Sequence, residues 1–372
     1  MMFRNNKKQV RRVDLAGYWE LVWWRFRRHR MAMLGGSILS VFLVIALFCE
    51  ILAPYGPQTR NSKYSQGHPM GIHFIDQDYK VHLRPFVYGR ETKRDPVSFR
   101  LSSQVNTDVH WPIHFFVKGD SYKFWGMFES NIHLFGTTSG GIHLFGTDKL
   151  GRDVFSRILY ATRISLSVGA VGVFFAFVLG LTMGGIAGYM GGRVDEFIMR
   201  MIEFIRSIPT LPLWLAMAAA LPREWSSLKV YVAVTIILAC IGWTNLARRV
   251  RSKLLSMREE EFILAARLSG CSGTRIIVRH MLPSFLSYLI VDLTISFPYI
   301  ILAETSLSFL GLGLREPIVS WGVLLFSAQN VRSIVHMPWL LLPCLFVVAA
   351  VLAFNFLGDG LRDAADPFAK IG

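Results

Sequence analysis

Long, nearly uncharged apolar segments constrain the fold of this chain more than any other feature of its sequence. A bilayer core is about 30 Å thick, so a helix that spans it needs roughly 20 mostly apolar residues. Six segments reach or approach that length, and the sequence therefore predicts an all-α polytopic membrane protein with six transmembrane helices. The predicted spans are residues 31–53, 164–190, 197–222, 229–247, 285–310 and 338–358.

The third predicted span is the weakest of the six. Its uncharged part covers only residues 207–222, so the helix has to begin near Phe197, with Arg200, Glu203 and Arg206 close to the membrane surface. A run of that length can also be re-entrant. We expect it to span, because otherwise the arginine-rich segment after the fourth span would face outward.

The positions of Lys and Arg predict the orientation of the spans. Basic residues accumulate in residues 1–30 and 248–284, and short cytoplasmic segments are enriched in Lys and Arg. This places both termini, including the tail 362–372, in the cytoplasm, and residues 54–157 outside. The first span is too long for the apolar region of a signal peptide and is expected to remain as an anchor. The net charge of +15 is explained by this topology, since no nucleic-acid motif is present.

The outer segment, residues 54–157, is long enough for a small domain. Extended stretches at 80–88 and 111–117, interrupted by Pro and Gly, predict a loop of mixed structure with short strands. Residues 132–137 (IHLFGT) recur as residues 142–147. We interpret this near-repeat as a hairpin or two stacked turns, since its period is too short for a solenoid.

Catalytic and metal-binding patterns are missing from the sequence. No G-x-x-x-x-G-K-[ST] or G-x-S-x-G motif occurs, so we expect no ATP site and no catalytic residue on this chain. His110 and His114 have helical spacing, but Pro112 lies between them and disfavours a helix. We expect no metal site, and interpret the histidines of the outer segment as polar surface and turn residues: His68, His73, His82, His110, His114, His133 and His143.

Two carboxylates lie inside the fifth predicted span, Asp292 and Glu304. An ionisable group in a membrane costs about 2.5–3.5 kcal/mol on insertion scales, so it is a candidate functional residue. One or both can line a solute path. The alternative is capping or pairing close to the membrane surface, and the sequence leaves both interpretations open.

Residues 259–283 (EEEFILAARLSGCSGTRIIVRHMLP) predict a helix-turn-helix in the cytoplasm. The first helix covers residues 259–268 and the second begins at Thr274. Gly270 suits the position after the first helix, where a positive φ is needed. Ala265 and Ala266 predict a small-residue face that permits close approach. The segment is connected to spans on both sides, and we interpret it as a docking site for a soluble partner; a solvated amphipathic loop is the alternative.

Several motifs in order along the chain resemble one known family. Residues 259–283 resemble the EAA loop of ABC importer permeases, with Ala265, Ala266 and Gly270 in place, although Leu264 stands where the family has Glu. Residues 143–157 (HLFGTDKLGRDVFSR) resemble the stretch before the second span of the C-type permease subunit of oligopeptide and dipeptide importers. Further matches are residues 163–169, 188–195, 307–313, 359–363 and 366–367.

The resemblance implies a type I ABC importer permease (MetI-like) core and a set of partners. These are a second homologous permease, two ATPase subunits that bind ATP, and an extracytoplasmic solute-binding protein. It also implies that the coupling loop, residues 248–284, contacts an ATPase subunit. The residues expected in that contact are Glu261, Ala265, Ala266, Gly270, Cys271, Thr274 and Arg275.

The solute and the energy source leave alternatives open. Peptides are the family's usual solute, but related permeases carry oligosaccharides or nickel. An ion-coupled secondary transporter would show inverted repeats and broken helices at the midplane, and we see no repeat between the halves. A membrane-bound enzyme would need a nucleophile and a base, and none is visible.

Overall fold

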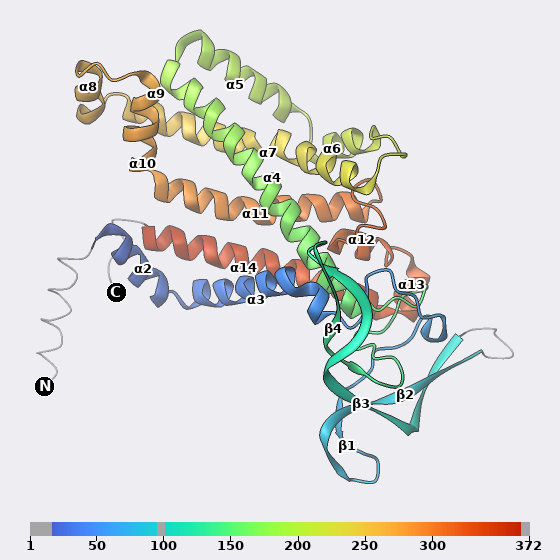
Figure 1. The fold of residues 1–372 in the computed structure, drawn as a ribbon. Helices are drawn as coiled ribbons and strands as arrows, with labels where there is room; N and C mark the ends of the chain where they lie inside the picture. The colour runs from blue at the N-terminus through green and yellow to red at the C-terminus, as the bar shows by residue number, and fades with distance from the viewer. Residues whose placement is uncertain (1–16, 95–100, 366–372) are drawn as a thin grey trace, which may run out of the picture.

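Long helices lie side by side in a layer, with a β-sheet at one end of it and short helices at the other (Figure 1). The computed structural model describes residues 17–94 and 101–365. We call the two ends the sheet end and the α8 end, the latter after the helix α8 (Glu261–Leu268). Most of the basic tail predicted for residues 1–30, and the end of the C-terminal tail, fall outside the described residues.

Within the described residues, five helices are long and apolar enough to cross a membrane. They coincide with five of the six predicted spans, although three extend well beyond the predicted bounds, the last one to Ala365. α4 begins well before residue 164, and α7 continues past residue 247 into the predicted coupling loop. The five are α3 (Arg30–Leu52), α4 (Val154–Met190), α7 (Ser227–Met257), α11 (Leu286–Phe309) and the segment Pro338–Ala365, which contains η3 (Pro338–Leu341) and α14 (Leu342–Ala365).

The expectation of one helix over residues 197–222 is wrong. The chain forms α5 (Gly192–Ser207) and α6 (Thr210–Ala219) instead, and α6 alone is too short to be a span of full length. The break lies at Ile208, whose backbone is extended (φ −93°, ψ 132°), because a residue before proline is pushed out of the helical region by Pro209.

The remaining helices are short and lie at the two ends of the layer. The helices at or near the α8 end are α2 (Tyr18–Arg28), α8 (Glu261–Leu268), α9 (Gly273–Ile276), the π-helical turn η2 (Ile277–Met281) and α10 (Leu282–Ser284). Those at or near the sheet end are η1 (Ser62–Tyr64), α12 (Trp321–Phe326) and α13 (Val331–His336).

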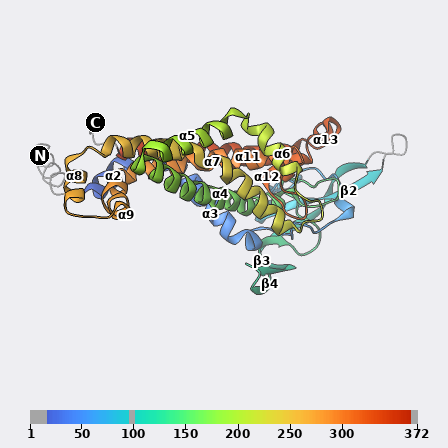
Figure 2. The ribbon, with the colours of Figure 1, turned by 90° about the horizontal axis from the view of Figure 1, so that it is seen from above.

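Small residues allow α4 and α7 to approach closely along the middle of the layer. Gly180, Gly184 and Gly188 repeat every fourth residue on α4, so they lie on one face. A Cβ added at Gly184 would lie 2.5 Å from the carbonyl oxygen of Ala247 on α7. This small-residue spacing is a common way to pack helices in membranes, where no hydrophobic force drives them together. The view from above shows α4 and α7 crossing in the same region (Figure 2).

The outer segment forms a four-stranded antiparallel sheet in the order β1 (His73–Ile75), β2 (Val81–Arg94), β3 (Leu101–Phe124) and β4 (Phe128–Thr137). The long β3 pairs with β2 through its first half and with β4 through its second half. Three of the four strands are therefore longer than the short strands predicted. The near-repeat does not pair with itself: residues 132–137 lie in β4, and residues 142–147 form a turn.

Candidate functional site

The segment between α7 and α11, residues 258–284, folds as the helix-turn-helix that the sequence predicts. α8 ends at Leu268, and Gly270 follows with φ +76°. The backbone N–H of Gly270 donates to the carbonyl of Arg267 (2.9 Å), and that of Cys271 donates to Ala266 (3.1 Å). This pair of bonds is a Schellman motif, which needs a left-handed residue at Gly270. The turn is thus fixed by the backbone.

Helix α8 divides its side chains between an inner and an outer face. Ile263 and Ala266 are buried, and they pack with Leu254, Ile276 and Met281 into one apolar cluster. The outer face carries Glu261, Leu264, Ala265 and Leu268, all of them exposed, and Leu268 is 90% exposed. The prediction that Ala265 and Ala266 share one small face is wrong, because neighbouring residues are about 100° apart on a helix.

The other predicted coupling residues lie around the turn. Cys271 is half-buried, whereas Thr274 and Arg275 are exposed. Gly273 and Arg267, which sequence reasoning did not assign to the contact, attach this turn to Tyr189 on α4. A Cβ at Gly273 would lie 2.6 Å from the ring of Tyr189, and the guanidinium of Arg267 lies 5.6 Å from the centre of the same ring. The turn therefore rests directly on the end of a membrane span.

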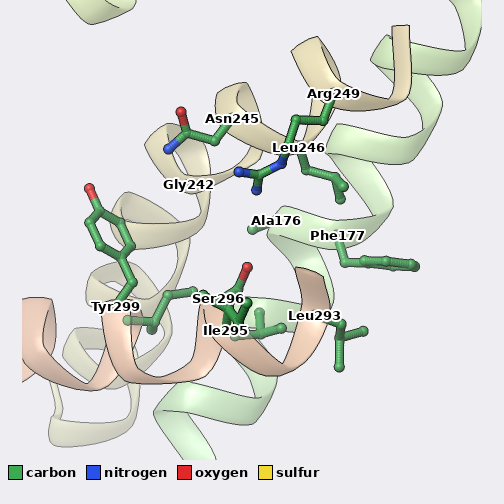
Figure 3. A pocket seen from close by; sticks show the side chains of 12 residues that line it. Ala176, Phe177, Gly242, Asn245, Leu246, Arg249, Leu293, Ile295, Ser296 and Tyr299 are labelled. Atoms are coloured by element: carbon green, nitrogen blue, oxygen red, sulfur yellow. The ribbon is translucent and has the colours of Figure 1, made fainter. Parts of the chain in front are cut away.

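A cavity of about 180 Å³ lies between α4, α7 and α11 in the middle of the layer (Figure 3). Its apolar wall includes Phe177 and Leu246, while its polar groups come from Asn245, Arg249, Ser296 and Tyr299. In Figure 3 the guanidinium of Arg249 and the hydroxyl of Ser296 point into the space between α7 and α11. Sequence reasoning singled out only the two carboxylates of the fifth predicted span and assigned Arg249 to the cytoplasmic loop, so it missed this polar lining.

Arg249 also borders a larger groove, of about 1380 Å³, that opens toward the α8 end. Asp292 lines the same groove and forms an ion pair with Arg249. The second carboxylate oxygen of Asp292 is buried and has no hydrogen-bond partner among the described residues. An acceptor without a partner in a buried position is costly, and the ion pair with Arg249 satisfies only part of this carboxylate.

Glu304 lies in different surroundings from Asp292. It is fully buried, and its Oε1 accepts hydrogen bonds from the hydroxyls of Ser308 and Ser320, both at 2.7 Å. The hydroxyl of Ser165 on α4 approaches its other oxygen at 3.5 Å. Glu304 therefore connects α4, α11 and the residue before α12, and these contacts favour internal pairing, the alternative considered for this residue.

A network of four charged side chains, three of them buried, joins the start of α4 to the loop after α11 at the sheet end. Arg152 and Arg157 both donate to Asp148, each at 2.7 Å, and both donate to Glu316 at 2.8 and 2.7 Å. Burial acts to raise the pKa of Glu316, but the hydrogen bonds from the two arginines outweigh it and lower that pKa to about 2. The FGTDxxGRDxxSR motif thus supplies three members of this network, which sequence reasoning did not assign.

Asp153, in the same motif, begins α4. Its carboxylate accepts a hydrogen bond from the backbone N–H of Ser156 (2.7 Å) and forms an N-cap. Its other oxygen bonds the ring of buried His143 (2.9 Å). The motif therefore fixes where the long helix starts and attaches it to the outer segment.

Long apolar helices around polar cavities, with a rigid turn at one end, define a polytopic membrane permease. The model of the binding-protein-dependent transport system inner membrane component matches residues 180–371, and that of the N-terminal TM domain of oligopeptide transport permease C matches residues 17–69. The chain belongs to the binding-protein-dependent transport system inner membrane component family. It is a multi-pass inner membrane protein, and the resemblance seen in the sequence is confirmed.

Curated relatives agree with this assignment. The dipeptide transport system permease protein DppC of Bacillus subtilis (strain 168) is 40% identical over 237 residues, which are 63% of this chain and 68% of that protein. The oligopeptide transport system permease protein OppC of the same organism is 35% identical over 239 residues, 64% and 72% of the two chains. DppC of Lactococcus lactis subsp. cremoris (strain MG1363) is 30% identical over 360 residues, 95% and 91% of the two chains.

The Lactococcus relative bears on the long outer segment. Its alignment covers 95% of this chain, so it includes most of residues 57–135, a loop longer than the family resemblance leads us to expect. Among solved structures, the inward-facing MetNI methionine ABC transporter is 20% identical with a TM-score of 0.45, over 56% of this chain and 97% of that chain.

Proposed function

We propose that this chain forms half of the translocation pathway of an ATP-driven importer for peptides. A second, similar permease supplies the other half, two ATPase subunits bind and hydrolyse ATP, and an extracytoplasmic binding protein delivers the peptide. This chain binds no ATP itself. Peptides are favoured over oligosaccharides or nickel because the relatives described above are named as dipeptide and oligopeptide permeases.

The observation that carries this proposal is the outer face of α8. Leu264, Ala265 and Leu268 project outward from a helix whose other face is packed, and the Schellman turn holds that helix in place. An exposed apolar strip on a rigid short helix suits insertion into a groove of another protein. The ATPase subunit is the partner that would push on it, since the turn rests on α4 through Tyr189.

The topology of the proposed transporter rests on the positions of Lys and Arg. The α8 end lies in the cytoplasm together with both termini, and the sheet end lies outside. The segment 192–219 completes a sixth membrane crossing as two helices, α5 and α6, meeting at Pro209. This arrangement keeps the basic residues 248–284 on the cytoplasmic side, as the positive-inside rule requires.

The cavity of Figure 3 and the groove beyond it form this chain's share of the solute path. Arg249 borders both, and its pair with Asp292 offers one positive and one negative group to a peptide, whose two ends carry the opposite charges. Asp292→Asn tests this part: peptide uptake falls while binding of the ATPase subunits is retained. Unchanged uptake would remove Asp292 from the path.

The α8 face is tested by Leu268→Asp in the reconstituted transporter. Placing a charge in an apolar contact should reduce peptide-stimulated ATP hydrolysis about tenfold, because about 1.4 kcal/mol of lost contact corresponds to that factor. Val331→Asp is the matched control, since Val331 is also an exposed apolar residue (74%) but lies in α13 at the sheet end. Equal coupling in the two variants would contradict the proposed docking. Gly270→Val is the companion variant, because it alters the turn and leaves the face unchanged.

A further inference from the structure

The turn between β3 and β4 is an apolar tip bracketed by two charges. The sequence over residues 123–129 is KFWGMFE, and Lys123 and Glu129 pair at 3.1 Å. Between them, Trp125, Met127 and Phe128 are 49, 72 and 67% exposed. A cluster of large apolar side chains projecting from a sheet is unfavourable in water. Such a cluster indicates a contact with a membrane or another protein, and the neighbouring segments show which.

The tip lies against the end of the membrane span α3. The indole Nε1 of Trp125 donates to the carbonyl of Leu47 (3.1 Å), and its backbone N–H donates to Glu50 (3.3 Å). The ring of Phe124 stacks on that of Phe48, with centroids 6.1 Å apart. Figures 1 and 2 agree with these contacts, because β3 and β4 adjoin the end of α3 in both views.

A third contact fixes the indole from the neighbouring span. The guanidinium of Arg163 on α4 lies 4.5 Å from the centre of the Trp125 ring, in the range of a cation–π interaction. The same guanidinium donates to the carbonyls of Ala46 and Leu47 and pairs with Glu50. α3 departs from helical geometry at Phe48 (φ −118°, ψ 21°), which fits carbonyls that bond side chains from outside the helix.

The backbone at the tip adopts a conformation that needs support from its neighbours. Trp125 has φ +51° and Gly126 has φ +73°. A bulky residue with a positive φ is uncommon, and its cost is of order 1–3 kcal/mol. The hydrogen bonds to Leu47 and Glu50 and the Arg163 contact offset that cost. The turn therefore has one orientation relative to the span.

The depth of the contact follows from helix geometry. Leu47 lies five residues before the end of α3 at Leu52, which is about 8 Å along a helix that rises 1.5 Å per residue. That is the level where Trp side chains accumulate in membrane proteins, at the boundary between hydrocarbon and headgroups. The apolar tip also continues an exposed apolar stripe on α3 formed by Leu43, Val44, Leu47 and Phe48.

We propose that residues 124–128 insert into the outer leaflet of the bilayer and hold the sheet against the membrane surface. Trp125 lies at the headgroup boundary, Met127 and Phe128 contact acyl chains, and the Lys123–Glu129 pair stays in the headgroup layer. The occupant of this surface is lipid, because the tip is continuous with the lipid-facing surface of a span. The proposal depends on α3 crossing the membrane, and is independent of which solute is carried.

Other exposed apolar residues of the sheet provide an internal contrast. Tyr79 and Leu83, at the turn between β1 and β2 and the start of β2, are 89 and 102% exposed. β1 lies at the part of the sheet farthest from the helices in Figure 1. These side chains are more exposed than those of the tip, and they lie on the strands away from α3. They serve as matched controls in water.

The test uses spin labels on single cysteines in the assembled transporter, in vesicles of phosphatidylethanolamine and phosphatidylglycerol. The four native cysteines are replaced, and labels are placed at Met127→Cys, Phe128→Cys, Leu83→Cys and, as the lipid reference, Leu43→Cys. Oxygen partitions into the bilayer and a nickel chelate stays in water. Labels at 127 and 128 should be relaxed mainly by oxygen, as at 43, and the label at 83 mainly by the chelate.

Two other results would overturn the proposal. If the labels at 127 and 128 are relaxed by the nickel chelate as strongly as the label at 83, the tip lies in water. If they are protected from both reagents, another protein chain covers the tip and lipid does not. Two adjacent label sites are used so that a local perturbation at one of them does not decide the result.

Discussion

The contacts at the sheet end and at the α8 end of the helix layer differ in kind. At the sheet end, Arg152 and Arg157 each bond both Asp148 and Glu316, and the two arginines are almost fully buried. At the α8 end, the segment 258–284 is held by apolar packing, one turn and the contact of Arg267 with the Tyr189 ring, and it has an exposed apolar face. Removing one partner of a buried ion pair is costly, whereas packed helices can slide past one another by small shear movements. We infer that the sheet end anchors the spans and the α8 end transmits movement.

Breaking the buried network should give the largest effect. Arg157→Met leaves Asp148 and Glu316 with one arginine instead of two, and removing one partner of a buried pair costs about 3–5 kcal/mol. We expect a clear drop in the thermal unfolding midpoint of the purified transporter. Arg332→Met is the control, because Arg332 is exposed and surface substitutions usually stay within about 0.5 kcal/mol. Similar unfolding midpoints for the two variants would contradict the inference that this charge network anchors the spans.

A smaller effect is expected where the turn rests on α4. A Cβ at Gly273 would lie 2.6 Å from the Tyr189 ring, and overpacking of this kind costs about 1–3 kcal/mol. Gly273→Ala should weaken peptide-stimulated ATP hydrolysis, and adding Tyr189→Ala should restore part of it. Gly185→Ala is the matched control, since nothing lies within 4 Å of its added Cβ. No rescue by the second substitution would mean that the ring does not transmit the movement.

The smallest effect expected is on the stability of the fold at acidic pH. The pKa of Glu316 is lowered from 4.5 to about 2, so its ion pairs stabilise the fold above about pH 4.5. This stabilisation is lost as the pH falls toward 2. The Glu316 side chain is 44% exposed, so solvent reduces the gain. Glu316→Gln should lower stability slightly at neutral pH and flatten the stability curve in that acid range. An unchanged curve would show that the arginines do not need this carboxylate.

Hydropathy, charge and motifs predicted the spans and the turn, because those features depend on local sequence. The five long helices follow from run length, and Gly270 was predicted to have a positive φ because a helix must end there. The break at Ile208 also had a local signal in Pro209, but the need for a sixth crossing outweighed it. The separation of Ala265 from Ala266 follows from helix rotation and was overlooked.

Contacts between distant segments were not predictable from one sequence. Glu316 lies far along the chain from Arg152 and Arg157, and its role appears only when α4 and the loop after α11 come together. Glu304 was identified as a buried carboxylate, but its partners Ser165 and Ser320 come from other elements. The tip at residues 124–128 depends likewise on where the sheet meets α3.

The account depends most on which side of the membrane each end faces, and cysteine labelling measures this directly. Leu268→Cys and Leu83→Cys place thiols at residues that are 90 and 102% exposed, one in α8 and one in the sheet. In right-side-out vesicles a membrane-impermeant maleimide should label position 83 and not 268, and in inside-out vesicles the pattern should reverse. Labelling of position 268 from the outside would contradict the proposed coupling of α8 to an ATPase.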